Sequence, residues 1–513
     1  MFTVFLKEFK FKNNKFYAII FSLILFVFGL YSLGHFPTGL FEDDTFFYYT
    51  TAYNSLKNGF FTFDGLNSTN GFHPLWMIFL IICGLPLKII GIKDPSIYGL
   101  FFNAISSLIW YLIFINLRNI WTQISALSLS FMTGFGMEGG LAGLIIVEIF
   151  KGYFNKSYKE KSWLYLPLIL TRIDLSLTAF ILAFRKNKFK FYKEFKPYFI
   201  ILLGICLTFL FNFIIDGHPL SISSFIKSSE ITPIFKILKG NLTQNIGNYF
   251  RYLFIFSMSC IVFYLVYLKK RRPHLFSNSI PDFTTNLYLF SASLSFLVFH
   301  TFFSDTRDWY FTPTGVSLIF LVDKLISQNK VNINIKSLIN FFILIITFIE
   351  LSASLGYFFK EYKSSLLTAE FIKETKNILP NKSKAYVFDS SGFLSWNLLP
   401  EVNVINGDGL INSHSYYKMI TQKNTELFLN YIRNNDIQYY VTNGNFKHCL
   451  GNPYIYKKCE HLKLRDGYSV GKDNFYQSHF EMIGGKELLK SASNRTFLKY
   501  KLFKYPDSIF QDN

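Results

Sequence analysis

The sequence predicts a mainly α, polytopic membrane protein that ends in a small α/β domain outside the membrane. Of its 513 residues, 50% are hydrophobic and 20% are aromatic, which exceeds what a soluble domain requires. Apolar runs of membrane-spanning length recur through residues 1–358. In residues 359–513, helix-like stretches alternate with short β-rich ones such as "KAYVFD", "EVNVI" and "IQYYVT". These three observations define the predicted fold class.

We expect about nine to eleven membrane segments. The apolar runs lie at 17–35, 75–92, 96–116, 120–135, 137–150, 163–184, 197–215, 250–268, 284–303, 312–327 and 338–358. The first has no small-residue cleavage site, so we expect it to be retained as a span. Gly84 and Pro86 interrupt the second, which predicts an interfacial or re-entrant segment. The 163–184 run has basic loops on both sides, so it should enter the membrane and return.

The distribution of basic residues predicts how the chain is oriented in the membrane. The formal net charge is +19, and the Lys and Arg residues cluster in short loops such as "KEFKFKNNK" and "KKRRPH". Loops of this kind are typical of the cytoplasmic side, so this charge does not indicate nucleic-acid binding. The N-terminus is therefore expected in the cytoplasm and the C-terminal domain outside. A bacterial inner membrane with a periplasmic C-terminal domain fits best, although the endoplasmic reticulum would give the same topology.

The first outer loop begins with three carboxylates. Glu42, Asp43 and Asp44 directly follow the first span and precede a helical pattern of apolar residues. Asp43 and Asp44 are therefore expected at the N-cap of that helix. Capping requires only one short polar residue, whereas three carboxylates at the outer membrane surface favour catalysis, with capping alone as the alternative.

Several motifs resemble the GT-C glycosyltransferases, integral membrane enzymes that use lipid-phosphate-linked sugars as donors. "DDTFFYYTTAYNSLKNGFFTF" followed by "NGFHPLW" is similar to the first outer loop of bacterial members. "GMEGGLAGL", "TRID", "NFIIDGHPLSISSFIK" and "RDWYFTP" follow in the expected order. "VNVINGDGLINSHSYY" is similar to the outer domain of one bacterial subgroup, as in arabinofuranosyl- and mannosyltransferases. The resemblance implies a GT-C catalytic domain over 1–358, with its first outer loop at 37–74, and a periplasmic α/β domain over 359–513.

The resemblance also implies a reaction. One sugar, a hexose or a pentose, would move from a polyprenyl-phosphate donor to a glycan, lipid or protein acceptor on the outer face, in contact with membrane lipid. The acidic motif of the first loop supplies the base in this family, which implies Asp43 or Asp44. We favour Asp43 slightly, because Asp44 is the better placed N-cap. A base opposite the leaving group would give inversion.

Three cations are candidates for binding the donor phosphate: Arg172, Arg307 and Lys227. Arg172 stands two residues from Asp174 inside an apolar segment, so a structural ion pair between them is the alternative. Arg307 lies between two aspartates and could instead be a paired loop residue.

Candidates for binding acceptor or sugar are Glu138, His73, His218, Trp309 and Tyr310. Glu138, between glycine-rich neighbours, could equally be a solvated turn residue. The two histidines are more often hydrogen-bonding loop residues than ligands. The two aromatic residues could stack on sugar, although an interfacial belt is their more common role.

No cofactor is expected. The sequence has no His/Cys cluster with zinc spacing, and a divalent cation on Asp43 and Asp44 is possible but not required, because cationic side chains can neutralise a single phosphate. Cys449 and Cys459 lie in the polar tail at a spacing that suits a disulfide, with two free thiols as the alternative.

Two other classes of protein compete with an enzyme. A transporter or flippase would also carry intramembrane charges such as Arg172 and Asp174. The sequence has no internal repeat, and its acidic cluster lies in a loop, which argues against that class. A receptor whose spans serve only as an anchor would have no use for buried charges.

Overall fold

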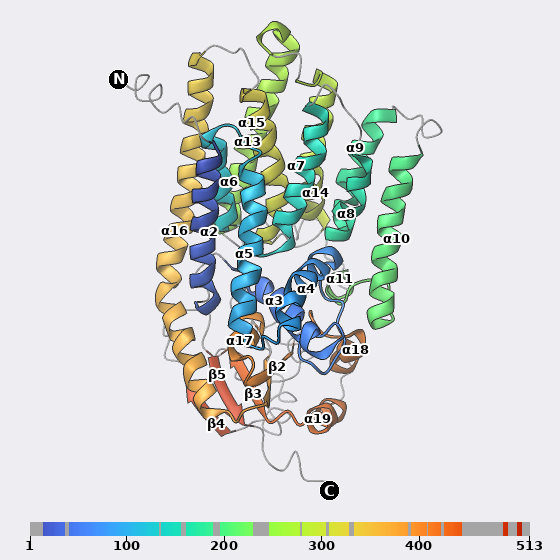
Figure 1. The fold of residues 1–513 in the computed structure, drawn as a ribbon, viewed down its shortest axis with the longest axis vertical. Helices are drawn as coiled ribbons and strands as arrows, with labels where there is room; N and C mark the ends of the chain where they lie inside the picture. The colour runs from blue at the N-terminus through green and yellow to red at the C-terminus, as the bar shows by residue number, and fades with distance from the viewer. Residues whose placement is uncertain are drawn as a thin grey trace, which may run out of the picture.

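The computed structural model describes most of the chain, and helices dominate it (Figure 1). The described residues are 14–35, 41–132, 135–154, 161–187, 195–228, 246–276, 280–303, 307–327, 333–387, 391–407, 409–421, 425–443, 486–490 and 500–504. Within them, five helices contain stretches long and apolar enough to cross a bilayer: α2 (Asn14–Gly34), α5 (Pro95–Phe114), α10 (Lys196–Asp216), α13 (Ile246–Arg271) and α16 (Ile333–Ile378).

Other helices, most of them shorter, occupy the remaining predicted apolar segments. They are α4 (Pro74–Ile89), α6 (Ile120–Met132), α7 (Glu138–Phe154), α8 (Tyr165–Thr171), α9 (Ser176–Asn187), α14 (Phe283–Phe303) and α15 (Phe311–Ser327). The 3-10 turns η1 (Ser162–Leu164), η2 (Ile173–Leu175), η3 (Pro273–Leu275) and η4 (Asp308–Tyr310) join some of them. The prediction of a mainly helical architecture is confirmed segment by segment.

Helix α15 lies at the centre of the bundle and is buried along nearly its whole length. It packs against α6, α7, α13 and α14. Two glycines on α7 allow α7 and α15 to approach each other closely. A Cβ added at Gly143 would lie 3.1 Å from the Val316 side chain, and one at Gly139 would lie 3.0 Å from Thr312 Cβ. Small residues let membrane helices approach closely, because dispersion contacts then replace contacts with lipid.

The first outer loop contains α3 (Asp43–Asn58), which is followed by Gly59 in the left-handed conformation at φ 83°. The N-cap residue is Glu42, whose backbone is extended, and it makes no side-chain capping hydrogen bond. The expectation that Asp43 and Asp44 occupy the N-cap is therefore wrong by one or two positions. Both lie in the first helical turn, where the positive end of the helix dipole stabilises a carboxylate.

The 163–184 segment is broken in the middle. Helix α8 ends at Thr171, Arg172 has an extended backbone at φ −156°, and η2 leads into α9. Ile169 of α8 packs closely on Gly204 of α10. Because irregular backbone at membrane depth is tolerated only where protein or a cavity surrounds it, the break marks an enclosed polar site.

Helix α16 continues without interruption past residue 358, the predicted domain boundary, and leads to a five-stranded sheet. The strands are β1 (Ser383–Val387), β2 (Val402–Asn406), β3 (Tyr439–Asn443), β4 (Lys486–Lys490) and β5 (Tyr500–Lys504), in the order β2-β1-β3-β5-β4. Strand β1 pairs in parallel with β2 and β3, whereas β5 pairs antiparallel with β3 and β4. The three predicted β-rich stretches coincide with β1, β2 and β3.

The sheet region also contains α17 (Ser391–Leu398), α18 (His414–Thr421) and α19 (Thr425–Asn434). Together with β1–β5 we call it the C-terminal region. Figure 1 places it at one end of the molecule, with α3, α4 and α11 (Ile222–Ser228) between it and the long helices. The first outer loop is thus enclosed between the two.

Several polar contacts join the C-terminal region to the rest of the chain, and two of them involve Asn67 and Asp216. Asn67 donates hydrogen bonds to Asp64 Oδ2 at 2.9 Å and to the Tyr431 hydroxyl at 2.8 Å. At the end of α10, one Asp216 oxygen accepts from the backbone N–H of His414 at 2.8 Å and lies 2.5 Å from its Nδ1. These links fix the position of the C-terminal region over the first loop.

Candidate active site

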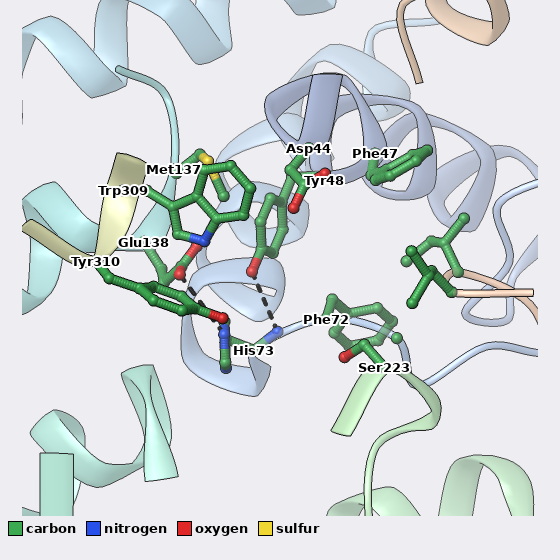
Figure 2. A pocket seen from close by; sticks show the side chains of 13 residues that line it. Asp44, Phe47, Tyr48, Phe72, His73, Met137, Glu138, Ser223, Trp309 and Tyr310 are labelled. Carbon is green, nitrogen blue, oxygen red and sulfur yellow. Dashed lines mark hydrogen bonds and ion pairs between the residues drawn. The ribbon is translucent and has the colours of Figure 1, made fainter. Parts of the chain in front are cut away.

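A pocket lies where the predicted first outer loop, the start of α7, α11 and η4 meet the C-terminal region (Figure 2). Its lining residues come from all of these elements: Asp44, Phe47, Tyr48, Gly71, Phe72, His73, Met137, Glu138, Ser223, Trp309, Tyr310, Leu410 and Ile411. In Figure 2, Trp309, Tyr310, Met137 and Glu138 lie on one side, and Phe47, Phe72 and Ser223 on the other. Asp44, Tyr48 and His73 lie between them.

Asp43 and Asp44 have different surroundings although they are adjacent in sequence. The Asp43 carboxylate accepts hydrogen bonds from the backbone N–H of Phe393 at 2.8 Å and of Gly392 at 3.2 Å, at the start of α17. Asp44 lines the pocket. Asp43 therefore binds the C-terminal region, whereas the Asp44 side chain lines the pocket.

Glu138 is the first residue of α7 and is fully buried. Its Oε1 accepts from Arg172 Nη1 at 2.6 Å and lies 3.5 Å from His73 Nε2. It is thus not a solvated turn residue. Burial, together with the nearby Glu138 carboxylate, raises the pKa of Tyr48 well above its ordinary value. The Tyr48 hydroxyl therefore stays protonated and can donate a hydrogen bond.

Arg172 lies in the break between α8 and α9 and pairs with two carboxylates. Its Nε and Nη2 donate to the two oxygens of Asp174 at 3.1 and 2.8 Å, and its Nη1 donates to Glu138. The bidentate geometry with Asp174 is the strong form of such a pair. The ion pair weighed as an alternative is therefore present. A role in phosphate binding remains a prediction that would require the guanidinium to exchange partners.

Aromatic rings and a histidine complete this buried network. The Arg172 guanidinium carbon lies 4.5 Å from the centre of the Tyr310 ring and 5.1 Å from that of Phe296. His300 Nε2 lies 2.8 Å from Asp174 Oδ2. The result is a continuous chain of polar contacts from His73 in the pocket to His300 on α14. It fixes the orientation of the Glu138 carboxylate at the pocket wall.

Of the remaining predicted residues, some line the pocket and others do not. Trp309 and Tyr310 line it, while Arg307, two residues before Trp309, is exposed. Lys227 lies on α11 with Ser223, and its side chain is outside the described residues. His218 stacks on His414, with ring centres 4.2 Å apart, and does not line the pocket. Four of the predicted residues, His73, Glu138, Trp309 and Tyr310, thus line one pocket, and their role in binding acceptor or sugar stays a prediction.

Sequence reasoning missed part of the pocket. Tyr48 lies in the quoted first-loop motif, where it could have been found from its position one helical turn after Asp44. Phe72, Met137 and Ser223 likewise lie in or beside quoted motifs. Leu410 and Ile411 also lie in a quoted motif, "VNVINGDGLINSHSYY", but two aliphatic residues after a turn are ordinary in any globular domain, so nothing marked them as pocket residues.

The described residues contain no group of three or more His, Cys, Asp or Glu side chains that could hold a metal ion. The possible divalent cation on Asp43 and Asp44 stays a prediction, and Asp43 would have to leave the α17 backbone to contribute to it. The predicted Cys449–Cys459 pair lies outside the described residues.

Comparison with known proteins supports the fold. No protein-family model matches the chain, and no curated protein matches it. Among solved structures, the crystal structure of ArnT from Cupriavidus metallidurans bound to undecaprenyl phosphate is similar, with a TM-score of 0.50 and 9% sequence identity. The match covers 96% of this chain and 99% of that one. The chain therefore has the ArnT fold over nearly its whole length, which confirms the predicted GT-C fold.

Proposed function

We propose that this chain is an integral membrane glycosyltransferase, which transfers one hexose or pentose from a polyprenyl-phosphate donor to a hydroxyl group of a cell-envelope acceptor. The site would face the outer side of a bacterial inner membrane. The observation that carries the proposal is a pocket in which Asp44 lies beside the buried Glu138 and His73. The fold shared with ArnT, whose solved structure holds undecaprenyl phosphate, supports a lipid-phosphate donor.

Asp44 is the general base in this proposal. Its carboxylate takes the proton of the acceptor hydroxyl, and the acceptor oxygen forms a bond to the anomeric carbon of the donor. The bond from that carbon to the phosphate oxygen breaks, and its electron pair leaves with polyprenyl phosphate. With the base opposite the leaving group, the anomeric centre is inverted. We prefer Asp44 to Asp43, because the Asp43 carboxylate already accepts two backbone hydrogen bonds.

The buried network positions the substrate groups. Arg172 holds Glu138 at the pocket wall, where its carboxylate and the His73 ring can orient sugar hydroxyls. Such preorganised polar groups act without reorganising during the reaction. We assign Arg307 and Lys227 to the departing phosphate, since Lys227 belongs to α11, which also contributes Ser223, and Arg307 directly precedes η4, which contributes Trp309 and Tyr310. The scheme uses no cofactor.

The test is a transfer assay on the purified protein with a panel of radiolabelled polyprenyl-phosphate sugars and envelope extract as acceptor. We expect Asp44→Asn to lower kcat by roughly 10²–10⁴-fold, the usual contribution of a general base. The substitution removes the charge but keeps the shape, so the fold and the affinity for undecaprenyl phosphate should be retained. Asp43→Asn is the matched comparison and should retain more activity.

Two outcomes would contradict this proposal. Full activity in a folded Asp44→Asn protein would move the base to another carboxylate, with Glu138 as the next candidate. Absence of transfer from every donor, combined with movement of a labelled lipid across reconstituted vesicles, would instead favour the flippase interpretation.

A further inference from the structure

The side of the pocket contributed by the C-terminal region consists of Leu410 and Ile411, which lie between β2 and α18. We propose that this pair, called the aliphatic wall below, binds the acceptor and selects a sugar ring of an envelope polysaccharide. The inference rests on the glycosyltransferase function proposed above. It makes the C-terminal region a part of the acceptor site.

The backbone before the aliphatic wall forms a fixed turn. Gly409 has φ 85°, a conformation that side-chain-bearing residues rarely adopt. Its N–H donates to Asn406 Oδ1 at 2.9 Å, and its carbonyl accepts from Asn412 N–H at 3.2 Å. These bonds hold Leu410 and Ile411 in one orientation, and Ile411 is only 2% exposed.

The aliphatic wall is also held directly against the first outer loop. Thr69 Oγ1 donates to the Asn412 carbonyl at 3.1 Å. Gly71 contacts the wall so closely that an added Cβ would lie 2.9 Å from Ile411 Cα and would collide with the Leu410 carbonyl oxygen. Only glycine fits at position 71 without displacing the wall. The wall and the loop that carries His73 therefore form one surface.

A second contact fixes the C-terminal region relative to Asp44. The start of α17 is bound by Asp43, the residue before Asp44. A Cβ at Gly392 would lie 3.0 Å from Phe47 Cδ1 and would collide with the Asp43 backbone. The contacts at Gly71 and at Asp43 together fix the distance between the aliphatic wall and Asp44, the proposed base.

The wall lies on the side from which an acceptor must come. The isoprenoid chain of a donor stays in the bilayer, so the donor reaches the pocket from the long helices. In Figure 1 the C-terminal region lies at the opposite end, beyond α3 and α4. A substrate that contacts Leu410 and Ile411 therefore approaches from outside the membrane.

The chemistry of the wall fits a sugar ring. Leu410 is half-buried and offers a hydrocarbon side chain with the buried Ile411 packed behind it, whereas Asp44, Tyr48 and His73 offer hydrogen-bonding groups from the neighbouring loop. A pyranose or furanose presents C–H groups on its face and hydroxyls at its edge, so it matches a pocket with one apolar side and a few convergent polar groups. The hydroxyl edge would be directed to Asp44.

The test uses the full-length protein in lipid nanodiscs and the radiolabelled donor that the wild type uses. The acceptors are delipidated envelope polysaccharide and an envelope protein fraction freed of polysaccharide. We expect label in the polysaccharide. Leu410→Ala should raise the half-saturating polysaccharide concentration by about tenfold, through loss of its methyl groups from the contact. Ile411→Ala should raise it as well, because it removes the buried side chain that supports Leu410. The half-saturating donor concentration should not change.

Gly71→Ala gives an independent test, because it displaces the wall without changing its side chains. It should raise the half-saturating polysaccharide concentration as well. Gly356→Ala is the matched control: Gly356 lies in α16 with no atom near an added Cβ, so its kinetics should equal those of the wild type. A thermal shift with undecaprenyl phosphate verifies that each variant is folded and binds the carrier lipid.

The possible outcomes separate the two proposals. Transfer by the wild type with unchanged polysaccharide dependence in folded Leu410→Ala, Ile411→Ala and Gly71→Ala overturns the acceptor wall and leaves the glycosyltransferase in place. Label confined to the protein fraction also overturns it, since the acceptor would not be a sugar. If the wild type transfers nothing from any donor, both proposals fail.

Discussion

Asp43 accepts hydrogen bonds from two backbone N–H groups at the start of α17, and its neighbour Asp44 lines the pocket. Hydrogen bonds to a charged group contribute about 1.5–3 kcal/mol each. Asp43→Ala is therefore expected to lower the free energy of unfolding by about 2 kcal/mol or more, and by more than Asp44→Ala, whose carboxylate lines the pocket. Thermal unfolding in detergent would measure both. Equal loss in the two variants would contradict the division of roles.

The second prediction at this scale concerns Arg172. Its replacement by Met would leave Glu138 and Asp174 buried without their shared counter-charge, which typically costs about 3–5 kcal/mol. Arg433→Met is the control, because Arg433 pairs with an exposed Glu426, and exposed pairs contribute about 1 kcal/mol at most. Yield of folded protein and thermal midpoint are the measurements. A stable Arg172→Met protein would mean that the network is not essential to the fold.

At the scale of elements, the first outer loop contains a buried carboxylate. Asp64 accepts hydrogen bonds from the backbone N–H groups of Leu66 and Asn67, both to Oδ1, yet burial outweighs them and raises its pKa above the ordinary value. A carboxyl group whose pKa is raised by folding favours the folded state while protonated. That contribution is complete below the ordinary Asp pKa of about 4 and is lost as the pH rises through the raised value.

The thermal midpoint of the wild type should therefore fall more steeply from pH 4 upward than that of Asp64→Asn, which cannot ionise at this position. A difference in thermal midpoint that does not vary with pH carries no information, since Asn also changes the hydrogen bond to Asn67. The test is how steeply each thermal midpoint changes with pH. Parallel curves would show that Asp64 titrates alike in the folded and unfolded states.

At the scale of the whole molecule, we predict which side of the membrane each end of the structure faces. The C-terminal region lies at one end of the structure, and the basic loop after α13 lies between α13 and α14. By the positive-inside rule we expect that loop in the cytoplasm and the C-terminal region in the periplasm. Cysteines introduced at the exposed positions Lys418 and His274, in a variant without the five native cysteines, report the two sides.

A membrane-impermeant maleimide added to intact spheroplasts should label Lys418→Cys at once, and His274→Cys only after lysis. The lysed sample is the control for reactivity of each thiol. The reverse pattern would place the C-terminal region in the cytoplasm and would remove the proposed site from the outer face.

Sequence patterns predicted much of the fold because its main determinants are local. A helix that contacts lipid needs apolar side chains over its own length and satisfies its own backbone hydrogen bonds. The helices α2, α5, α10, α13 and α16 could thus be predicted without any knowledge of their partners. Strands β4 and β5 were not predicted, because "KELLK" and "YKLFK" owe their conformation to pairing with each other and with β3.

Local patterns along the chain predicted the apolar segments, the acidic start of the first loop and four pocket residues, His73, Glu138, Trp309 and Tyr310, because motif order and side-chain chemistry are readable without a fold. Which of these side chains contact one another depends on the tertiary structure. That Asp43 binds α17 and that Leu410 and Ile411 complete the pocket depends on contacts between segments about 350 residues apart. Such contacts arise from packing of the whole molecule, and no local periodicity encodes them.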